Sequence, residues 1–287
     1  MKKIGFIDFF LDEWHANNYP EWIREDCKTA GWDMDLSYAW AKTGKPEGLD
    51  TASWCGKYGV EALSSIDELV KKSDYIIVLS PDNPEYHEEL SRIPLMSGKP
   101  VYIDKTFSPD LLSGMRMFEL ACKYSTPMFS TSALRFSKEL ADYPNARVNR
   151  DSLEFAATLG PGLFTNYSVH QLEMIVLLMG TGVKRLKCLS TRNARSLILE
   201  YEDGRRASML QMQELPFQVS LQLKSGEGVF INQCSDMFPR LIHEILDFFE
   251  TGKSPVPKEE TLEVMALIEA GLKAVTRDDT WITVEHP

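Results

Sequence analysis

The sequence predicts an α/β chain of two domains, a Rossmann-like, doubly wound parallel sheet at residues 1–132 and an α+β domain with a mostly antiparallel sheet at 133–287. Three observations support this. Short β-type runs alternate with helical patterns in the first part, as in βαβ units. Later strand candidates follow one another through tight turns, as in hairpins. The length of 287 residues is sufficient for two packed domains.

The first domain is expected to alternate strand and helix from its start. Strands are predicted at 3–7, 35–39, 75–79, 101–103 and 128–130, and helices at 19–30, 65–72, 86–96 and 109–124. Gly31 is expected to end the first helix as its C-cap, and Gly98-Lys99-Pro100 to end the third. Pro109 is expected at the first position of the fourth helix, where the missing N–H costs nothing.

The second domain is expected to change to hairpins. A strand at 153–159 is broken by Gly160-Pro161-Gly162 before a helix at 166–179. Strands are then predicted at 196–201, 205–213, 218–223 and 229–233. Two amphipathic helices close the chain, with apolar stripes at Phe238, Leu241, Ile242, Ile245 and Phe249 and at Leu262, Met265, Ile268 and Leu272.

The composition excludes several classes of partner. The formal net charge is -11 and the pI is near 5.0, whereas nucleic acid and anionic membranes demand a basic face. No stretch approaches a membrane-spanning length. Five cysteines are widely separated and never form a C-x-x-C pair, which indicates free thiols in a reducing compartment. We therefore expect a cytoplasmic protein with no nucleic-acid or membrane partner.

The loop after the first strand lacks the glycines of a dinucleotide fold. In the G-x-G-x-x-G fingerprint they form a tight turn and let the backbone approach the pyrophosphate. Asp8, Phe10 and Glu13 stand in those places. A helix N-terminus attracts phosphate, and we expect Asp8, Asp12 and Glu13 to repel it. Some of these acids are expected to cap the following helix, while Phe9 and Phe10 pack the loop.

Other features of the chain resemble a known family. They are the run Ser80-Pro81-Asp82-Asn83-Pro84-Glu85-Tyr86-His87, the run from Gly98 to Asp104-Lys105-Thr106, the pair Arg135-Phe136, the helix with Asn166 and His170, and the ending Phe249-Glu250-Thr251-Gly252. In their order along the chain these resemble the Gfo/Idh/MocA oxidoreductases, which include relatives of glucose–fructose oxidoreductase and inositol dehydrogenase. The resemblance covers essentially the whole chain.

The resemblance implies a nucleotide-binding first domain, an open sheet in the second, and hydride transfer between a nicotinamide and a sugar, polyol or cyclitol hydroxyl in the cleft between them. It also implies a homodimer or homotetramer formed through the C-terminal sheet. Three features depart from the family pattern: the acidic loop, Thr106 where the family has proline, and Asn166 where an aspartate is usual. Glu173 stands where another acid is usual.

The candidate catalytic residues are Lys105, His170, Asn166 and Tyr167. Lys105 follows a strand of the parallel sheet, where such sheets place ligands. His170 lies one turn after Asn166, so both project from one helix face, and an imidazole can take a proton from a hydroxyl near neutral pH. The alternative for each is a structural role. Arg135 is a candidate for binding an anionic group of the substrate, together with Lys105 and His170.

The candidate cofactor-binding residues lie at the ends of the predicted parallel strands. They are Asp8, Phe9, Phe10, Trp40, Ser80, Pro81, Asn83, His87, Asp104 and Lys105. The second strand lacks the acid that binds ribose hydroxyls. Trp40 could stack on adenine and Lys42 could meet a 2′-phosphate, which favours NADP over NAD; packing and exposure are the alternatives. For His87 packing at the surface is the favoured alternative.

No recognised metal-ligand spacing is present, although Asp8, Asp12, Glu13 and His15 lie close together in the sequence. Two functions stay open. The first is an NAD(P)-dependent oxidoreductase with an atypical acidic phosphate loop, acting on a small, sugar-like substrate. The second is a cofactor-free relative without catalytic activity, which binds a small polar ligand or a partner subunit in the interdomain cleft.

Overall fold

The computed structural model describes residues 1–141 and 150–286. The chain divides into a first unit, Met1–Thr131 with Leu241–Pro257, and a second unit, Ser132–Arg240 with Lys258–Pro287. The second unit differs from the expected domain at 133–287, because residues 241–257 group with the first unit.

The first unit contains a parallel sheet. Its strands are β1 (Lys2–Asp8), β2 (Met34–Ala41), β3 (Glu61–Ala62), β4 (Tyr75–Val78), β5 (Val101–Ile103) and β6 (Met128–Ser130), in the order β3-β2-β1-β4-β5-β6. All neighbouring pairs are parallel. The strand order reverses at β1, which lies between β2 and β4 and is fully apolar in the centre because both faces of the sheet are covered. The predicted doubly wound sheet is confirmed, and its switch point is at the carboxyl end of β1.

Helices connect these strands. They are α1 (Trp14–Ala30), α2 (Thr51–Tyr58), α3 (Ile66–Lys72), the 3₁₀ turn η1 (Pro84–Tyr86), α4 (His87–Leu95) and α5 (Leu111–Lys123). The predicted first residues of two helices, α1 and α5, were wrong. Helix α1 begins five residues before 19, because Glu13 supplies its cap, and α5 begins after Pro109, because Asp110 accepts a hydrogen bond from the Ser113 amide at 2.7 Å. Helix α2 and the short strand β3 were not predicted.

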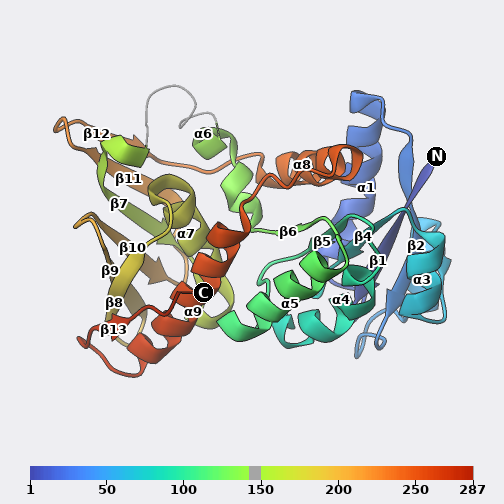
Figure 1. The fold of residues 1–287 in the computed structure, drawn as a ribbon, viewed down its shortest axis with the longest axis horizontal. Coiled ribbons are helices and arrows are strands. Elements are labelled where there is room, and N and C mark those ends of the chain that lie inside the picture. The colour runs from blue at the N-terminus through green and yellow to red at the C-terminus, as the bar shows by residue number, and fades with distance from the viewer. Residues whose placement is uncertain (142–149, 287) are drawn as a thin grey trace. The chain divides into compact units, whose positions relative to one another are not determined.

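Helix α8 (Met237–Thr251) returns to the first unit late in the chain, and Figure 1 shows it beside α1. Phe249 stacks on Tyr75 of β4 with ring centres 4.8 Å apart and planes 3° apart. Phe248 meets Phe129 of β6 edge to face at 4.9 Å. These rings are buried, so the predicted apolar stripe of α8 covers the parallel sheet.

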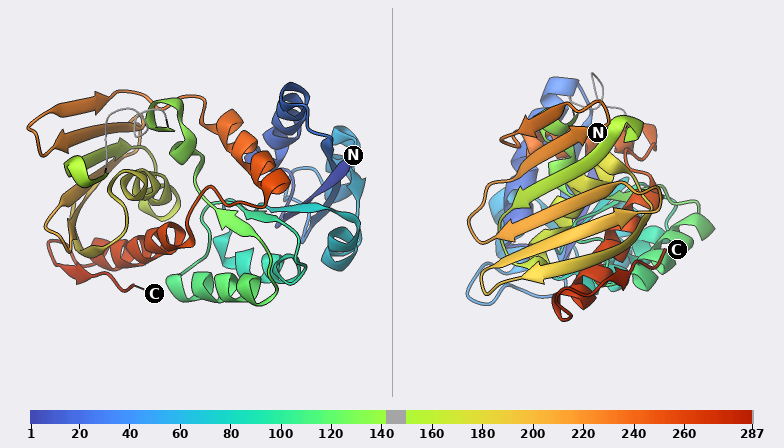
Figure 2. Two further views of the ribbon diagram at one scale, coloured as in Figure 1. Left: turned by 45° about the horizontal axis from the view of Figure 1, so that its top comes forward. Right: turned by 90° about the vertical axis from the view of Figure 1, so that its left-hand side faces the viewer.

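The second unit contains a mostly antiparallel sheet. Its strands are β7 (Leu153–Gly160), β8 (Val183–Ser190), β9 (Ala194–Tyr201), β10 (Arg206–Met212), β11 (Gln218–Leu223), β12 (Gly228–Ile231) and β13 (Ile282–Thr283). Their order is β12-β11-β7-β10-β9-β8-β13, and β7 with β10 is parallel. The right-hand view of Figure 2 shows the strands of this sheet in front. The predicted hairpins are confirmed, while β8 and β13 were not predicted.

Helices α7 (Phe164–Met179) and α9 (Lys258–Val275) pack against each other and on this sheet, α7 on β7 and α9 on β8. Short elements complete the unit: the 3₁₀ turns η2 (Ala133–Phe136) and η3 (Arg150–Ser152), and α6 (Lys138–Ala141). Among the described residues, none of the helices combines the length and the apolar character that crossing a bilayer requires.

Candidate functional site

The N-terminus of α1 is occupied by a side chain of the protein itself. The Glu13 carboxylate accepts hydrogen bonds from the backbone N–H of His15, at 2.7 Å, and of Ala16. The carbonyl of Glu13 accepts from the Asn17 N–H at 2.9 Å. Glu13 is only 7% exposed. The amide groups that a phosphate would need at the start of this helix are therefore already bonded.

The carboxyl groups of the other two acids of this loop, Asp8 and Asp12, have other partners than the backbone amides at the start of α1. Asp12 accepts from the Asn17 side chain and from the Leu49 N–H, both at 3.0 Å. Asp8 is 1% exposed, and one of its carboxyl oxygens accepts from the Phe9 N–H at 2.6 Å, while the other accepts no hydrogen bond within standard geometry from the residues that the structure describes. Burial, followed by the charge of Glu13, raises the pKa of Asp8 well above its ordinary value. Asp8 therefore keeps its proton to higher pH than an ordinary aspartate, so its charge contributes less to repelling a phosphate than the sequence suggested.

A buried cluster of titratable groups adjoins Glu13. The His15 imidazole pairs with the Asp104 carboxylate through Nδ1 and stacks on the Tyr19 ring at 5.2 Å. Burial raises the pKa of Glu13 to about 7, against the opposing charge of His15. Burial acts in the same direction on Asp104, but His15 and Lys105 outweigh it and hold the pKa of Asp104 below its ordinary value. The cluster thus combines the Asp104 carboxylate, whose pKa is lowered, with the His15 imidazole. It also contains the Glu13 and Asp8 carboxyls, whose pKa values are raised.

The loop that follows β2 is bonded directly to the loop that follows β1. The Lys42 N–H donates to the Asp8 carbonyl and the Thr43 N–H to the Phe9 carbonyl, both at 3.0 Å. The Lys45 ammonium donates to the Asp12 carbonyl at 2.7 Å. Backbone and side-chain hydrogen bonds therefore both hold the loop after β2 against the loop after β1.

The aromatic and basic candidates of this region also have partners within the chain. Phe9 stacks on Tyr86 with ring centres 4.5 Å apart, and Phe10 meets Phe9 edge to face at 5.7 Å. Lys42 pairs with Glu89 and lies over the Tyr86 ring. Trp40 is half-buried in β2. The expected packing of Phe9 and Phe10 is confirmed, and Lys42 is paired with an acid.

The candidates after β4 and β5 form a second set of local contacts. Lys105 is half-buried and donates from Nζ to the Pro81 carbonyl at 3.0 Å, and the Ser80 hydroxyl donates to the Asn83 carbonyl at 3.2 Å. His87 is fully buried between the carbonyls of Leu79, 2.5 Å from Nε2, and Phe107, 3.1 Å from Nδ1. The expected surface position of His87 is wrong. Burial lowers its pKa, and because a neutral imidazole has a single N–H, the ring donates to one of these two carbonyls at a time.

These observations test whether the first unit fits a nicotinamide dinucleotide in the usual pose of the fold. That pose needs open amide groups at the start of α1 and a glycine backbone that allows close approach. Here a carboxylate holds the amides, and the loops after β1 and β2 are bonded to each other. The residues at this edge do not fit the pyrophosphate.

The second unit brings together the other candidates on α7. His170 is half-buried, and its Nδ1 lies 2.7 Å from the Ser132 hydroxyl. The rings of Tyr167 and Phe217 meet the imidazole edge to face, at 5.4 and 5.6 Å. Asn166 is exposed one turn before His170. The Ser132 hydroxyl and these two rings therefore help to hold the imidazole, and of the three the sequence pointed to Tyr167 alone.

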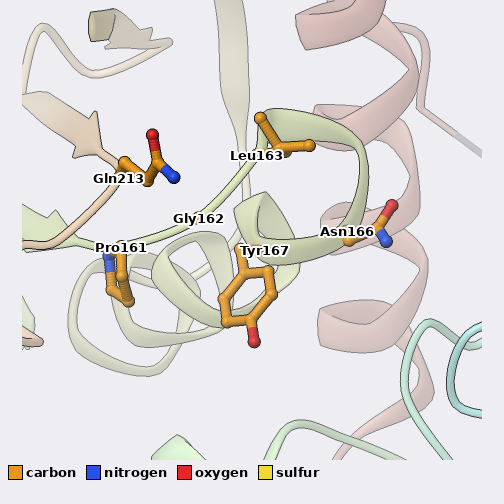
Figure 3. A pocket seen from close by; sticks show the side chains of 6 residues that line it. All are labelled: Pro161, Gly162, Leu163, Asn166, Tyr167 and Gln213. Carbon is orange, nitrogen blue, oxygen red and sulfur yellow. The ribbon is translucent and has the colours of Figure 1, made fainter. Parts of the chain in front are cut away.

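A pocket of about 370 Å³ lies at the start of α7. It is lined by Pro161, Gly162, Leu163, Asn166, Tyr167 and Gln213, and Figure 3 shows their side chains. Gly162 has a φ of +85°, and a side chain there would collide with the Tyr167 ring. The polar lining consists of two carboxamides and a phenol, without a charged group. This chemistry suits hydroxyl groups of a neutral ligand.

Arg135 lies beside α7 and forms buried ion pairs that link α7 to α9. It is 5% exposed, and its guanidinium donates to Glu173 of α7 at 2.9 Å and to Glu260 of α9 at 2.6 Å. Arg150 donates to the other oxygen of Glu260 at 2.6 Å. Burial alone would lower the pKa of Arg135, but the two glutamates raise it. The expected role of Arg135 in binding an anionic substrate is not supported, because its guanidinium is buried and paired.

Sequence reasoning missed Ser132, Phe217, Gln213 and Glu260 as parts of this site. They come from distant segments, and no motif marks them. Throughout residues 1–141 and 150–286, no group of three or more His, Cys, Asp or Glu side chains is arranged to hold a metal ion.

No protein-family model matches the sequence, and no curated protein matches it. Solved structures do resemble the chain. A protein described as a probable dehydrogenase from Thermotoga maritima has a TM-score of 0.80 at 15% identity, covering 98% of each chain. GenD2 from gentamicin A biosynthesis, in complex with NAD, has a TM-score of 0.78 at 11% identity, covering 99% of this chain and 97% of its own.

UDP-N-acetylglucosamine 3-dehydrogenase GnnA from Acidithiobacillus ferrooxidans has a TM-score of 0.75 at 12% identity, covering 95% of this chain and 97% of its own. At such low identity these likenesses establish the fold. The fold expected from the resemblance to the Gfo/Idh/MocA oxidoreductases is thereby confirmed over nearly the whole chain.

Proposed function

We propose that this protein binds a small, uncharged, sugar- or polyol-like ligand in the pocket at the start of α7. The observation that carries the proposal is the lining of this pocket, in which Asn166, Tyr167 and Gln213 supply polar groups without charge. Leu163 and Pro161 add apolar surface. Binding pockets combine mostly apolar walls with a few polar groups that fix orientation, and a cyclic polyol presents hydroxyls and an apolar ring face to such walls.

His170 is a candidate proton acceptor beside this pocket. Its ring contacts Tyr167 of the pocket, and the Ser132 hydroxyl at Nδ1 fixes its orientation. An imidazole can accept a proton from a ligand hydroxyl, with an ordinary pKa of about 6.5 that suits neutral pH. His170 thus adjoins the pocket lining through Tyr167, and it is the candidate base for a ligand hydroxyl in the hydride-transfer reaction considered below.

Calorimetry tests the proposal with myo-inositol, D-glucose and D-gluconate. We expect the neutral compounds to bind more tightly than the anionic gluconate. Tyr167→Ala should weaken binding by about tenfold, since it removes both a ring contact and a hydroxyl. Tyr124→Ala, which removes an exposed tyrosine of the first unit, is the matched control. Equal binding by the wild type and Tyr167→Ala, or tighter binding of gluconate, would contradict the proposal.

Hydride transfer between a nicotinamide and a hydroxyl substrate is the second candidate function. Lys105 favours it, because it follows β5 at the edge where doubly wound sheets place ligands. The misfit of the phosphate region weighs against it. Turnover of NAD(P)+ with polyols decides between the two: if the chain is a dehydrogenase, Lys105→Ala or His170→Ala should lower turnover by more than about a hundredfold. Nearly unchanged rates would remove both residues from the mechanism.

A further inference from the structure

We propose that Glu13 is a resident substitute for the phosphate that this fold ordinarily binds at the N-terminus of α1, so that the first unit carries a self-occupied anion site. The Glu13 carboxylate uses both oxygens, one for the His15 N–H and one for the Ala16 N–H. These are the donors that a phosphate would take. An incoming phosphate must displace the Glu13 carboxylate from these two amides. This displacement is costly, because hydrogen bonds to an ionised acceptor are about twice as strong as those between neutral groups.

The surrounding loops hold Glu13 in this position. Its own N–H donates to the Leu11 carbonyl at 2.8 Å. Asp12, the residue before it, is held by the Leu49 N–H and the Lys45 ammonium. A side chain at Gly48 would lie 2.7 Å from the Asp12 carboxylate, which shows how closely the second loop presses on the first. Displacing Glu13 therefore requires the two loops to separate as well as one side chain to rotate.

The charges around Glu13 make its hold dependent on pH. Asp8 faces it from the end of β1, His15 from α1 and Asp104 from the end of β5. A protonated Glu13 is a weaker acceptor for the helix amides than a carboxylate. Since burial raises the pKa of Glu13 to about 7, the carboxylate share falls between pH 8 and pH 6. The hold of Glu13 on the helix amides should therefore weaken as the pH falls from 8 to 6.

The test measures ADP and NADH binding by calorimetry to the wild type and three variants. Glu13→Ser leaves a neutral hydroxyl that can cap one of the two amides and frees the other, while Glu13→Gln keeps one of the two acceptor oxygens and removes the charge. Asp12→Asn removes an acid of the same loop that does not touch the helix amides, and its amide oxygen can still accept from the Leu49 N–H, so that the contact between the two loops is kept. We expect Glu13→Ser to bind ADP at least about tenfold more tightly than the wild type at pH 8, Glu13→Gln to lie between, and Asp12→Asn to change little.

Several results would overturn the proposal. Micromolar binding of ADP or NADH by the wild type at pH 8 would show that the site is open. A folded Glu13→Ser variant without gain, or an equal gain in Asp12→Asn, would show that occupation by Glu13 is not the obstacle. If Glu13→Ser fails to fold, the pH series decides: wild-type affinity for ADP should rise from pH 8 to pH 6 more than that of Glu13→Gln. Parallel pH dependence of ADP affinity in the wild type and Glu13→Gln would refute the proposal.

Discussion

Asp8 shows at the scale of one residue how burial sets the charge of the loop after β1. Its pKa is raised first by burial and then by Glu13. An acid whose pKa is higher in the folded state stabilises the fold at low pH, and this contribution is lost as the pH rises through the folded pKa. The wild type should therefore lose stability relative to an uncharged variant as the pH rises above the ordinary range of aspartate.

Asp8→Asn tests this directly. The amide oxygen can still accept from the Phe9 N–H, so the local fold is kept. We expect little change at pH 4 and a variant more stable than the wild type by about 1 to 3 kcal/mol at pH 9, measured by urea unfolding at several pH values. Asp12→Asn is the control of opposite sign, because hydrogen bonds lower the pKa of Asp12. Parallel stability curves for the wild type and Asp8→Asn would contradict the argument.

At the scale of elements, a helix or strand could be predicted from the sequence where residues within it or next to it determine its position. The strands of the parallel sheet were predicted because each is a short apolar run between turn residues. Helix α1 was placed late because a glutamate is not among the usual N-cap residues, and only the structure shows Glu13 bonded to the amides. Strand β8 was not predicted, since the adjacent basic residues Lys184 and Arg185 interrupt the apolar–polar alternation that identifies a strand.

The same distinction explains the site. The spacing of Asn166 and His170 on one helix face was predictable, whereas the Ser132 hydroxyl and the Phe217 ring reach His170 only through the fold. Pairing of Arg135 with Glu260 was equally hidden, because 125 positions separate them. A sequence can place a residue on an element, but long-range partners decide whether its side chain is available for a ligand.

The ion-pair network around Arg135 connects η2, α7 and α9, so its loss should be felt by the whole second unit. Arg135→Ala leaves the buried Glu173 carboxylate without its guanidinium partner, while Glu260 keeps only Arg150, and we expect it to destabilise the protein by about 3 to 5 kcal/mol in urea unfolding. Replacing Glu173 by Gln in the same variant should restore part of the loss. Arg116→Ala, which removes an exposed ion pair with Glu88, is the control and should cost about 1 kcal/mol or less.

At the scale of the whole molecule, the chain leaves the first unit after Thr131 and returns to it at Leu241. The apolar stripe of α8 predicted that this helix is buried, but a stripe does not identify the surface that it covers. The structure supplies that surface in Tyr75 and Phe129 of the parallel sheet. The first unit is therefore complete only after most of the second has been synthesised.

This arrangement predicts the behaviour of a fragment. Residues 1–131 alone should unfold at lower temperature and with less cooperativity than the first unit in the full chain, because the surface under α8 is exposed. Burial of each phenylalanine of α8 is worth about 1.5 to 3 kcal/mol. A synthetic peptide of residues 237–257 should therefore raise the melting temperature of the fragment, while the same peptide with Phe248 and Phe249 replaced by alanine should not. Equal melting with either peptide, or a fragment as stable as the full chain, would show that α8 is dispensable for this unit.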